Sequence, residues 1–210
     1  MIFKVLSFFV VILSISLSFY AYDKMSEKMA FHWNEMGEVD GYMTKTFALF
    51  LMPSISIILF LFFLAIPKID PLKENIKKFI NYYEMFFFAI LLFLLYISFL
   101  IIAWNIGFSF NMIQLLIPAF ACLFYCCGLL LERVERNWFI GVRTPWTLSS
   151  EKVWEKTNRL GAKLFKISSI IILFGLFFYE YAFLILIFSI LVSIVYLIVY
   201  SYYEYQKGEK

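Results

Sequence analysis

The chain has 210 residues, of which 63% are hydrophobic and 16% are charged, and its formal net charge at pH 7 is +3. Soluble domains carry about one-quarter charged residues, so this composition excludes an ordinary soluble protein and predicts one embedded in the lipid bilayer. Loops that face anionic lipid account for the small positive charge, so direct nucleic-acid binding need not be invoked.

A transmembrane helix needs about 20 apolar residues to cross a hydrocarbon layer of roughly 30 Å. Apolar runs predict six such helices, at 3–22, 46–66, 85–104, 108–131, 165–180 and 182–203. A tight turn at Glu180 is expected to separate the last two, because an acid between two tyrosines belongs at the membrane surface. We therefore predict an all-α polytopic bundle of six transmembrane helices, with short amphipathic interfacial helices in the outer and inner loops.

The distribution of lysine and arginine predicts the orientation of the chain, because cytoplasmic loops carry an excess of both. With the N-terminus inside, 15 of the 18 cationic residues face the cytoplasm, and only Lys24, Lys28 and Lys45 lie outside. We therefore expect a plasma-membrane protein with both termini in the cytoplasm.

The outer connection, residues 23–45, carries five acids and three lysines. Met25, Met29 and the pair His32 and Trp33 have helical spacing, which predicts a short surface helix that ends near Gly37, before an Asp40-Gly41 turn.

The residues with reactive side chains do not favour catalysis. The only histidine, His32, lies in the outer loop, whereas Cys122, Cys126 and Cys127 lie in the fourth span, so a cysteine–histidine pair would have to reach across the membrane. His32 with Glu35 and Asp40 could supply three zinc ligands, but a single histidine favours a side chain that only bonds locally or titrates at the surface. We predict no enzyme activity, no metal and no other cofactor.

The first inner connection predicts an interfacial helix over 70–83, with Asp70 as the N-cap and Pro71 at the first helical position. The second contains NWFIGVRTPWTLSSEKVW, residues 137–154, a polar segment unlike the rest of the chain. The preceding helix is expected to stop at Asn137 and Gly141, Thr144 before Pro145 to be extended, and Ser149 or Ser150 to cap a new helix.

Two kinds of side chain in this segment have alternative interpretations. Trp138, Trp146 and Trp154 are expected at headgroup depth, where an indole ring is favoured. Arg143 either reaches lipid phosphates or pairs with a fixed partner, such as a helix C-terminus or a carboxylate, and the sequence leaves both open.

Asn105, Asn111 and Gln114 lie near the outer side, where they are expected to hydrogen-bond between helices. A transporter that uses these polar residues of the fourth span is the alternative function.

Two groups of residues resemble motifs of the Sdp immunity protein family. The first group resembles the domain of unknown function that begins members of this family and consists of His32, Trp33, Asn34, Gly37, Asp40, Gly41, Tyr42, Lys45, Pro53, Pro67, Asp70, Pro71 and Asn75. The second group resembles the family's other signature and consists of Asn137, Gly141, Arg143, Thr144, Pro145, Trp146, Thr147, Val153 and Trp154. The match runs in order over nearly the whole chain.

The resemblance implies two parts, an N-terminal domain over 1–83 and an immunity-type domain over 84–210. It also implies a receptor that binds an extracellular peptide toxin and recruits a cytoplasmic regulatory protein, such as a transcriptional repressor. On this interpretation the ligand site in the outer loop consists of His32, Trp33, Asn34, Gly37, Asp40, Gly41 and Lys45. The inner loops would then supply a partner-binding or structural motif of Pro67, Asp70, Pro71, Asn75, Asn137, Gly141, Arg143, Thr144, Pro145, Trp146, Thr147 and Trp154.

Overall fold

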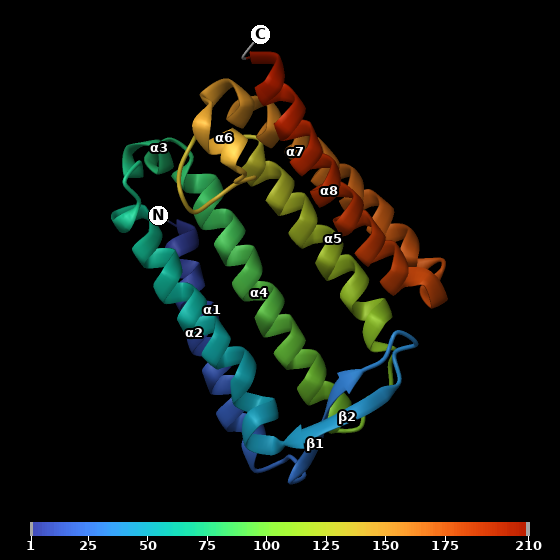
Figure 1. Cartoon of the computed structure of the whole chain (residues 1–210). Coiled ribbons are helices and arrows are strands. Elements are labelled where there is room, and N and C mark those ends of the chain that lie inside the picture. The colour runs from blue at the N-terminus through green and yellow to red at the C-terminus, as the bar shows by residue number, and fades with distance from the viewer. Residues whose placement is uncertain (1, 209–210) are drawn as a thin grey trace.

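The computed structural model describes residues 2–208 and consists of long helices side by side, with one β-hairpin across an end of the bundle (Figure 1). The long helices are α1 (Ile2–Tyr22), α2 (Lys45–Ile69), α4 (Ile80–Asn105), α5 (Met112–Leu131), α7 (Glu151–Leu173) and α8 (Ala182–Gly208). The short elements are β1 (Lys28–Trp33), β2 (Val39–Thr44), α3 (Lys73–Lys78), α6 (Pro145–Ser149) and the 3-10 helices η1 (Phe174–Leu176) and η2 (Tyr179–Tyr181).

Five of the six predicted spans correspond to helices that are long and apolar enough to cross a membrane, namely α1, α2, α4, α5 and α8. The fifth prediction, 165–180, does not correspond to one apolar helix. α7 ends at Leu173, and the two 3-10 helices, with Glu180 in the second, lead into α8. α7 is absent from the five because Glu151–Lys166 contains seven charged residues, so only its second half is uniformly apolar.

The helices form a bundle with two different ends (Figure 1). The beginning of α1 and the end of α8 lie with α3 and α6 at one end, which we call the terminal end. The hairpin β1–β2 and the connection between α4 and α5 lie at the other, which we call the hairpin end. α4 packs against α1, α2 and α5, and α5 packs extensively along α7.

The prediction of a surface helix over the outer connection is wrong, because this segment forms an antiparallel hairpin. Met29 pairs with Met43 and Ala30 with Tyr42, and the register shifts between Ala30 and Trp33. That irregularity interrupts the alternation that marks a strand, which explains the helix-like spacing of the apolar residues. The predicted Asp40-Gly41 turn is also wrong, because both residues lie within β2.

Pro67 lies inside α2 and therefore leaves one helical carbonyl without its usual donor. In an α-helix the N–H of residue 67 would bond the carbonyl of Phe63, and proline has no N–H. The hydroxyl of Tyr83 in α4 donates to this carbonyl instead, over 2.8 Å. Pro67 thus belongs to the helix packing.

Pro53 creates the same situation near the hairpin end of α2. The carbonyl it leaves free is that of Leu49, which accepts a hydrogen bond from the Ser18 hydroxyl of α1 at 2.7 Å. The two prolines thereby direct polar contacts from α2 to both of its neighbours.

Candidate functional site

The hairpin is held against the helix bundle by an asparagine at the end of α4. Asn105 accepts a hydrogen bond from the backbone N–H of Ala30 at 2.8 Å and donates to the Ala30 carbonyl at 2.9 Å. It also donates to the Ile101 carbonyl at 2.8 Å, which orients the amide. Ala30 is only 1% exposed, so these bonds satisfy two polar groups that water cannot reach.

A second asparagine holds the tip of the hairpin at the start of α5. Asn111 is the N-cap of α5, since its side chain accepts from the Gln114 N–H, and it donates to the Met36 carbonyl at 2.9 Å. A Cβ on Gly37, whose φ is +80°, would lie 2.5 Å from Asn111 Oδ1. Gly37 is therefore required both by the turn and by this close approach.

The turn itself is built by Asn34, which was predicted as a ligand residue. Its side-chain oxygen accepts from the N–H groups of Met36 and Glu38 at 3.0 and 2.9 Å. These local bonds are typical of an asparagine that stabilises a turn. Trp33, another predicted ligand residue, packs edge-on against Trp104 of α4, with 5.9 Å between the ring centroids. Both residues therefore hold the hairpin in place.

His32 and Asp40 are the exposed polar pair of the hairpin. Nδ1 of His32 lies 2.5 Å from Oδ1 of Asp40, and the two side chains are 72% and 45% exposed. A Cβ on Gly41 would lie 2.9 Å from Cβ of His32, so the bare backbone at Gly41 makes room for the imidazole. Within residues 2–208, no three His, Cys, Asp or Glu side chains form a group that could hold a metal ion.

Lys45, the last predicted outer-loop ligand residue, connects the hairpin to α1. Its ammonium lies 2.8 Å from the Glu27 carboxylate and 4.6 Å from the centre of the Tyr22 ring. The charge of Lys45 is therefore paired with a carboxylate of the same protein.

Asp70, at the terminal end, does not cap a helix over 70–83, and that prediction is wrong. The residue ends α2, the next helix begins only at Lys73, and a break at Phe79 separates it from α4. Asp70 is 2% exposed, and its carboxylate accepts from the N–H of Leu72 at 2.6 Å and from the N–H of Trp138 at 2.9 Å. It thus joins the α2–α3 turn, which contains the exposed Pro71, to the second inner connection.

Two asparagines extend this connection between the inner loops. Asn75 of α3 donates to the Arg136 carbonyl at 2.8 Å. Asn137 is fully buried, donates to the carbonyls of Glu135 and Ile140, and accepts from the N–H groups of Phe139 and Ile140. All the bonds of Asn137 are to backbone groups, so it shapes the loop.

Gly141 lies where the loop passes over α7. Its φ is +115°, and an added Cβ would lie 2.9 Å from Asn158 Oδ1 and 3.1 Å from the Trp154 ring. The same Asn158 oxygen accepts from the Val142 N–H at 2.8 Å. Trp154 is only 2% exposed and its indole N–H donates to the Val134 carbonyl at 3.1 Å. Trp154 is therefore packed inside the protein, where its indole supports the loop.

The Thr144-Pro145 step follows the sequence prediction. Thr144 is extended and forms a capping box with Thr147 at the start of α6, with Pro145 in its first turn. The Thr144 hydroxyl also donates to Ser201 of α8 at 3.0 Å. The Trp146 ring packs on Tyr202 of α8, with 5.2 Å between centroids. Ser150 caps α7 by accepting from the Val153 N–H, as one of the two predicted serines should.

The fixed partner of Arg143 is a backbone carbonyl in its own loop. The side chain is exposed, and Nη1 donates to the Trp138 carbonyl at 2.5 Å, which is a loop carbonyl and not a carboxylate or a helix end. A guanidinium carries five N–H donors in a planar fork, and this bond uses one nitrogen of the fork. The motif residue Arg143 and its bonded neighbour Trp138 are both exposed and therefore accessible to another molecule.

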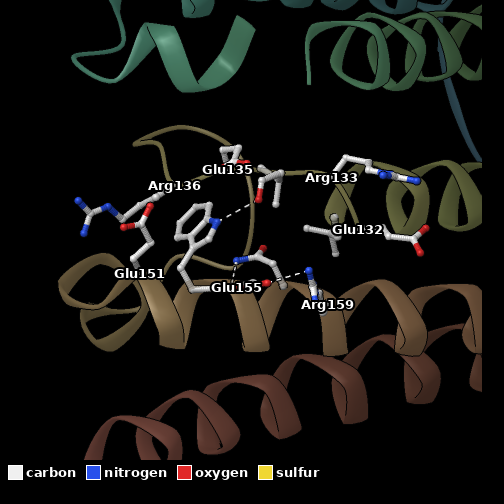
Figure 2. Close-up of a pocket in the computed structure, with 11 residues that line it drawn as sticks. Glu132, Arg133, Glu135, Arg136, Glu151, Glu155 and Arg159 are labelled. Carbon is white, nitrogen blue, oxygen red and sulfur yellow. Dashed lines mark hydrogen bonds and ion pairs between the residues drawn. The ribbon is translucent and has the colours of Figure 1, made fainter. Parts of the chain in front are cut away.

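A charged cavity of about 300 Å³ opens beside this loop, between residues 131–136 and α7. Figure 2 shows its labelled side chains in two groups, with Glu132, Arg133, Glu135 and Arg136 on the loop and Glu151, Glu155 and Arg159 on α7. Trp154 and Asn158 also line the cavity, so the residues that shape the loop are also in its wall.

Several of the charges around this cavity are paired. Glu132 lies 2.5 Å from Lys166, and this hydrogen-bonded ammonium holds the pKa of Glu132 below its usual value. Glu155 lies 2.7 Å from Arg159. The cavity is therefore a mixed-charge surface, suited to a polar partner with charges of both signs.

The sequence analysis did not identify four other residues that join these elements, namely Asn158, Ser18, Tyr83 and Ser201. Asn105 had been expected to bond between helices, but it bonds the hairpin. An asparagine at the end of an apolar helix is the one local signal that could have identified it, because a buried amide requires partners.

The chain is therefore a polytopic helical membrane protein with a β-hairpin and a structured loop at opposite ends. The model of the SdpI/YfhL protein family matches residues 133–201, and that of a domain of unknown function (DUF1648) matches residues 9–57. The immunity protein SdpI of Bacillus subtilis (strain 168) is 30% identical over 206 residues, which cover 97% of this chain and 96% of that protein. The chain belongs to the SdpI family.

The two matched ranges include both candidate sites, since β1 and β2 lie in the first and the loop over 133–150 in the second. The division into domains at residues 83 and 84 stays a prediction. No solved structure matches the chain.

Proposed function

We propose that the protein is a plasma-membrane immunity receptor that binds a secreted peptide at its hairpin end and thereby protects the cell. Family membership supports this proposal, because the relative from Bacillus subtilis is named an immunity protein and matches over nearly its full length. The residues with reactive side chains also support binding without catalysis, since the single histidine, His32, is paired with Asp40 at the surface.

In this proposal both termini are cytoplasmic and the hairpin is extracellular. The excess of lysine and arginine in the connections at the terminal end supports this orientation. α7 is then the fifth of six crossings, with its charged first half at the cytoplasmic side and its apolar second half, with η1, in the bilayer. Glu180 in η2 lies at the outer membrane surface.

The observation that carries the proposal is the link from the hairpin to the helices that lead to the opposite end. Asn105 and Asn111 attach the hairpin to the end of α4 and to the start of α5. α5 runs through the bundle and continues into the loop that contains Asn137 and Arg143. A peptide that shifts the hairpin therefore changes the balance between two packings of α4 and α5, and the loop at the other end reports it.

The cytoplasmic partner in this proposal is a regulatory protein that binds the exposed part of the loop. Arg143 and Trp138 are its contact residues, because both are exposed, and arginine and tryptophan are the residues most enriched at binding hot spots. The charged cavity beside the loop adds contacts of both signs.

Expression in a toxin-sensitive Bacillus strain that lacks its own immunity protein tests both parts. Cells with the wild-type chain should survive the secreted peptide toxin, and an Arg143→Ala variant should survive but fail to recruit the repressor to the membrane. Arg143→Lys should recruit less well, because an ammonium cannot reproduce a planar fork. Lys73→Ala, an exposed change at the same end, is the control.

Death of the cells that express the wild-type chain would refute protection. Recruitment that is unchanged in both Arg143 variants would remove this loop from the mechanism. Labelling of an Arg143→Cys variant only from the exterior would reverse the proposed orientation.

A further inference from the structure

The two edges of the β-hairpin differ, because a side chain already closes the edge formed by β1. The amide of Asn105 takes both backbone groups of Ala30, accepting from its N–H at 2.8 Å and donating to its carbonyl at 2.9 Å. A neighbouring strand would make the same two bonds through its peptide groups. Asn105 therefore stands in for a third strand on this side.

The register of the hairpin determines which backbone groups lie on the other edge. The N–H of Lys45 donates to the Glu27 carbonyl at 3.0 Å, so these two residues form a hydrogen-bonded pair. Such pairs alternate along an antiparallel ladder, which makes Met29 and Met43 the next one. Tyr42 then lies opposite Ala30 in a pair that exchanges no bonds, and its N–H and carbonyl point away from β1.

The free edge of β2 faces away from the bundle. β1 packs against α2 and α4, whereas β2 packs against β1 and the start of α2. Side chains on β2 are accessible, with Tyr42 64% exposed and Met43 41% exposed. Proteins usually protect such an edge with lysine or proline, and the sequence of β2, VDGYMT, contains neither.

The tip of the hairpin beside this edge is acidic. Glu35 and Glu38 are exposed, and neither has an ion-pair partner within residues 2–208. Glu38 lies four residues from Tyr42 along the chain, a span of about 13 Å in an extended strand. A strand laid along β2 therefore places one residue beside Tyr42 and another, about four positions away, near the acidic tip.

We propose that the free edge of β2 binds an extended peptide by strand addition, with the backbone groups of Tyr42 as its central hydrogen-bonding site. The peptide carries apolar side chains on the face of Tyr42 and a basic residue toward Glu35 and Glu38. This inference rests on the proposed function and specifies how the extracellular peptide is held. Main-chain bonds supply the affinity, and the acidic tip selects the charge of the ligand.

The test uses the full-length protein in lipid nanodiscs and a synthetic peptide of about ten residues that alternates valine and lysine. A second peptide has the same sequence with every backbone nitrogen methylated, so that it cannot donate along either edge. The unmodified peptide should bind and slow hydrogen exchange at the Tyr42 amide by about tenfold or more, with the Met43 amide unchanged. The methylated peptide should bind about tenfold more weakly or worse.

Two variants of the protein distinguish the contribution of the Tyr42 backbone to peptide binding from that of the Tyr42 side chain. Tyr42→Pro removes the outward N–H, which the hairpin does not use, so the hairpin should persist and peptide binding should fall by about tenfold. Tyr42→Phe keeps the backbone donor and should bind as the wild type does. Exchange at the Met43 amide verifies that the hairpin is intact in each variant.

Strand addition would be overturned by any one of three results. These are equal binding of the two peptides, wild-type binding by Tyr42→Pro with an intact hairpin, and absence of binding by the unmodified peptide. These results leave the proposed function intact if the wild-type chain still protects cells from the toxin. Conversely, cells that die although the Tyr42 amide is protected by the peptide would refute immunity but not this binding mode.

Discussion

Replacement of Asn105 by leucine should release the hairpin from the helix bundle. The two side chains are similar in size, but leucine cannot bond the Ala30 backbone or the Ile101 carbonyl. The change therefore removes the hydrogen bonds and leaves the volume almost unchanged, so that the effect can be assigned to the amide.

The expected magnitude follows from the burial of Ala30, which is 1% exposed. Each buried backbone group left without a partner costs about 1–3 kcal/mol, so the N–H and the carbonyl together cost about 2–6 kcal/mol while the hairpin stays docked. The hairpin can avoid this cost by undocking, which lets water reach both groups. The docked state should therefore lose about 2 kcal/mol or more, which is roughly a 30-fold shift toward the open state.

Oxidation of methionine measures this opening, because Met29 is fully buried and Met25 is 6% exposed beneath the hairpin. In the Asn105→Leu variant, hydrogen peroxide should oxidise Met29 much faster than in the wild type, as read by mass spectrometry of peptides. Ser109→Leu, an exposed change in the same connection, is the control and should leave Met29 protected. Equal oxidation rates in Asn105→Leu and the wild type would refute the role given to this amide.

Two further changes test the loop at the terminal end. Gly141→Ala forces a Cβ into a backbone with φ of +115°, 2.9 Å from Asn158 Oδ1 and 3.1 Å from the Trp154 ring. The free energy of unfolding in detergent should therefore fall by at least about 2 kcal/mol. An unchanged unfolding midpoint would contradict this. The Lys166 ammonium lowers the pKa of Glu132 in the folded state from its unperturbed value of 4.5. This pair therefore stabilises the folded state fully above pH 4.5. Its contribution is lost as the pH falls through the lower pKa of the folded state. The melting temperature of Glu132→Gln should therefore depend less on pH below 4.5 than that of the wild type, and identical acid limbs would remove the pair from the stability of this loop.

The features that depend on neighbouring residues could be predicted from the sequence. The apolar runs identify five of the long helices, because crossing a bilayer demands length and apolar composition and little else. Thr144 was expected to be extended before Pro145, and Ser149 or Ser150 to cap a new helix. Thr144 is extended and Ser150 caps α7, since both features depend on residues at most three positions apart. Family membership was also predicted, from motifs that span both inner loops and the hairpin.

The features that depend on residues far apart in the chain were decided only by the tertiary structure. The outer connection is a hairpin because Asn105 satisfies Ala30 across 75 positions, a contact that no local pattern describes. Asp70 bonds Trp138 across 68 positions, so its carboxylate joins two loops where a cap had been expected. Trp154 faces inward because the carbonyl of Val134 lies above it, whereas composition alone favours an indole at the membrane surface. In each case a buried polar group had to find a partner, and only the packed helices determined which partner lay within reach.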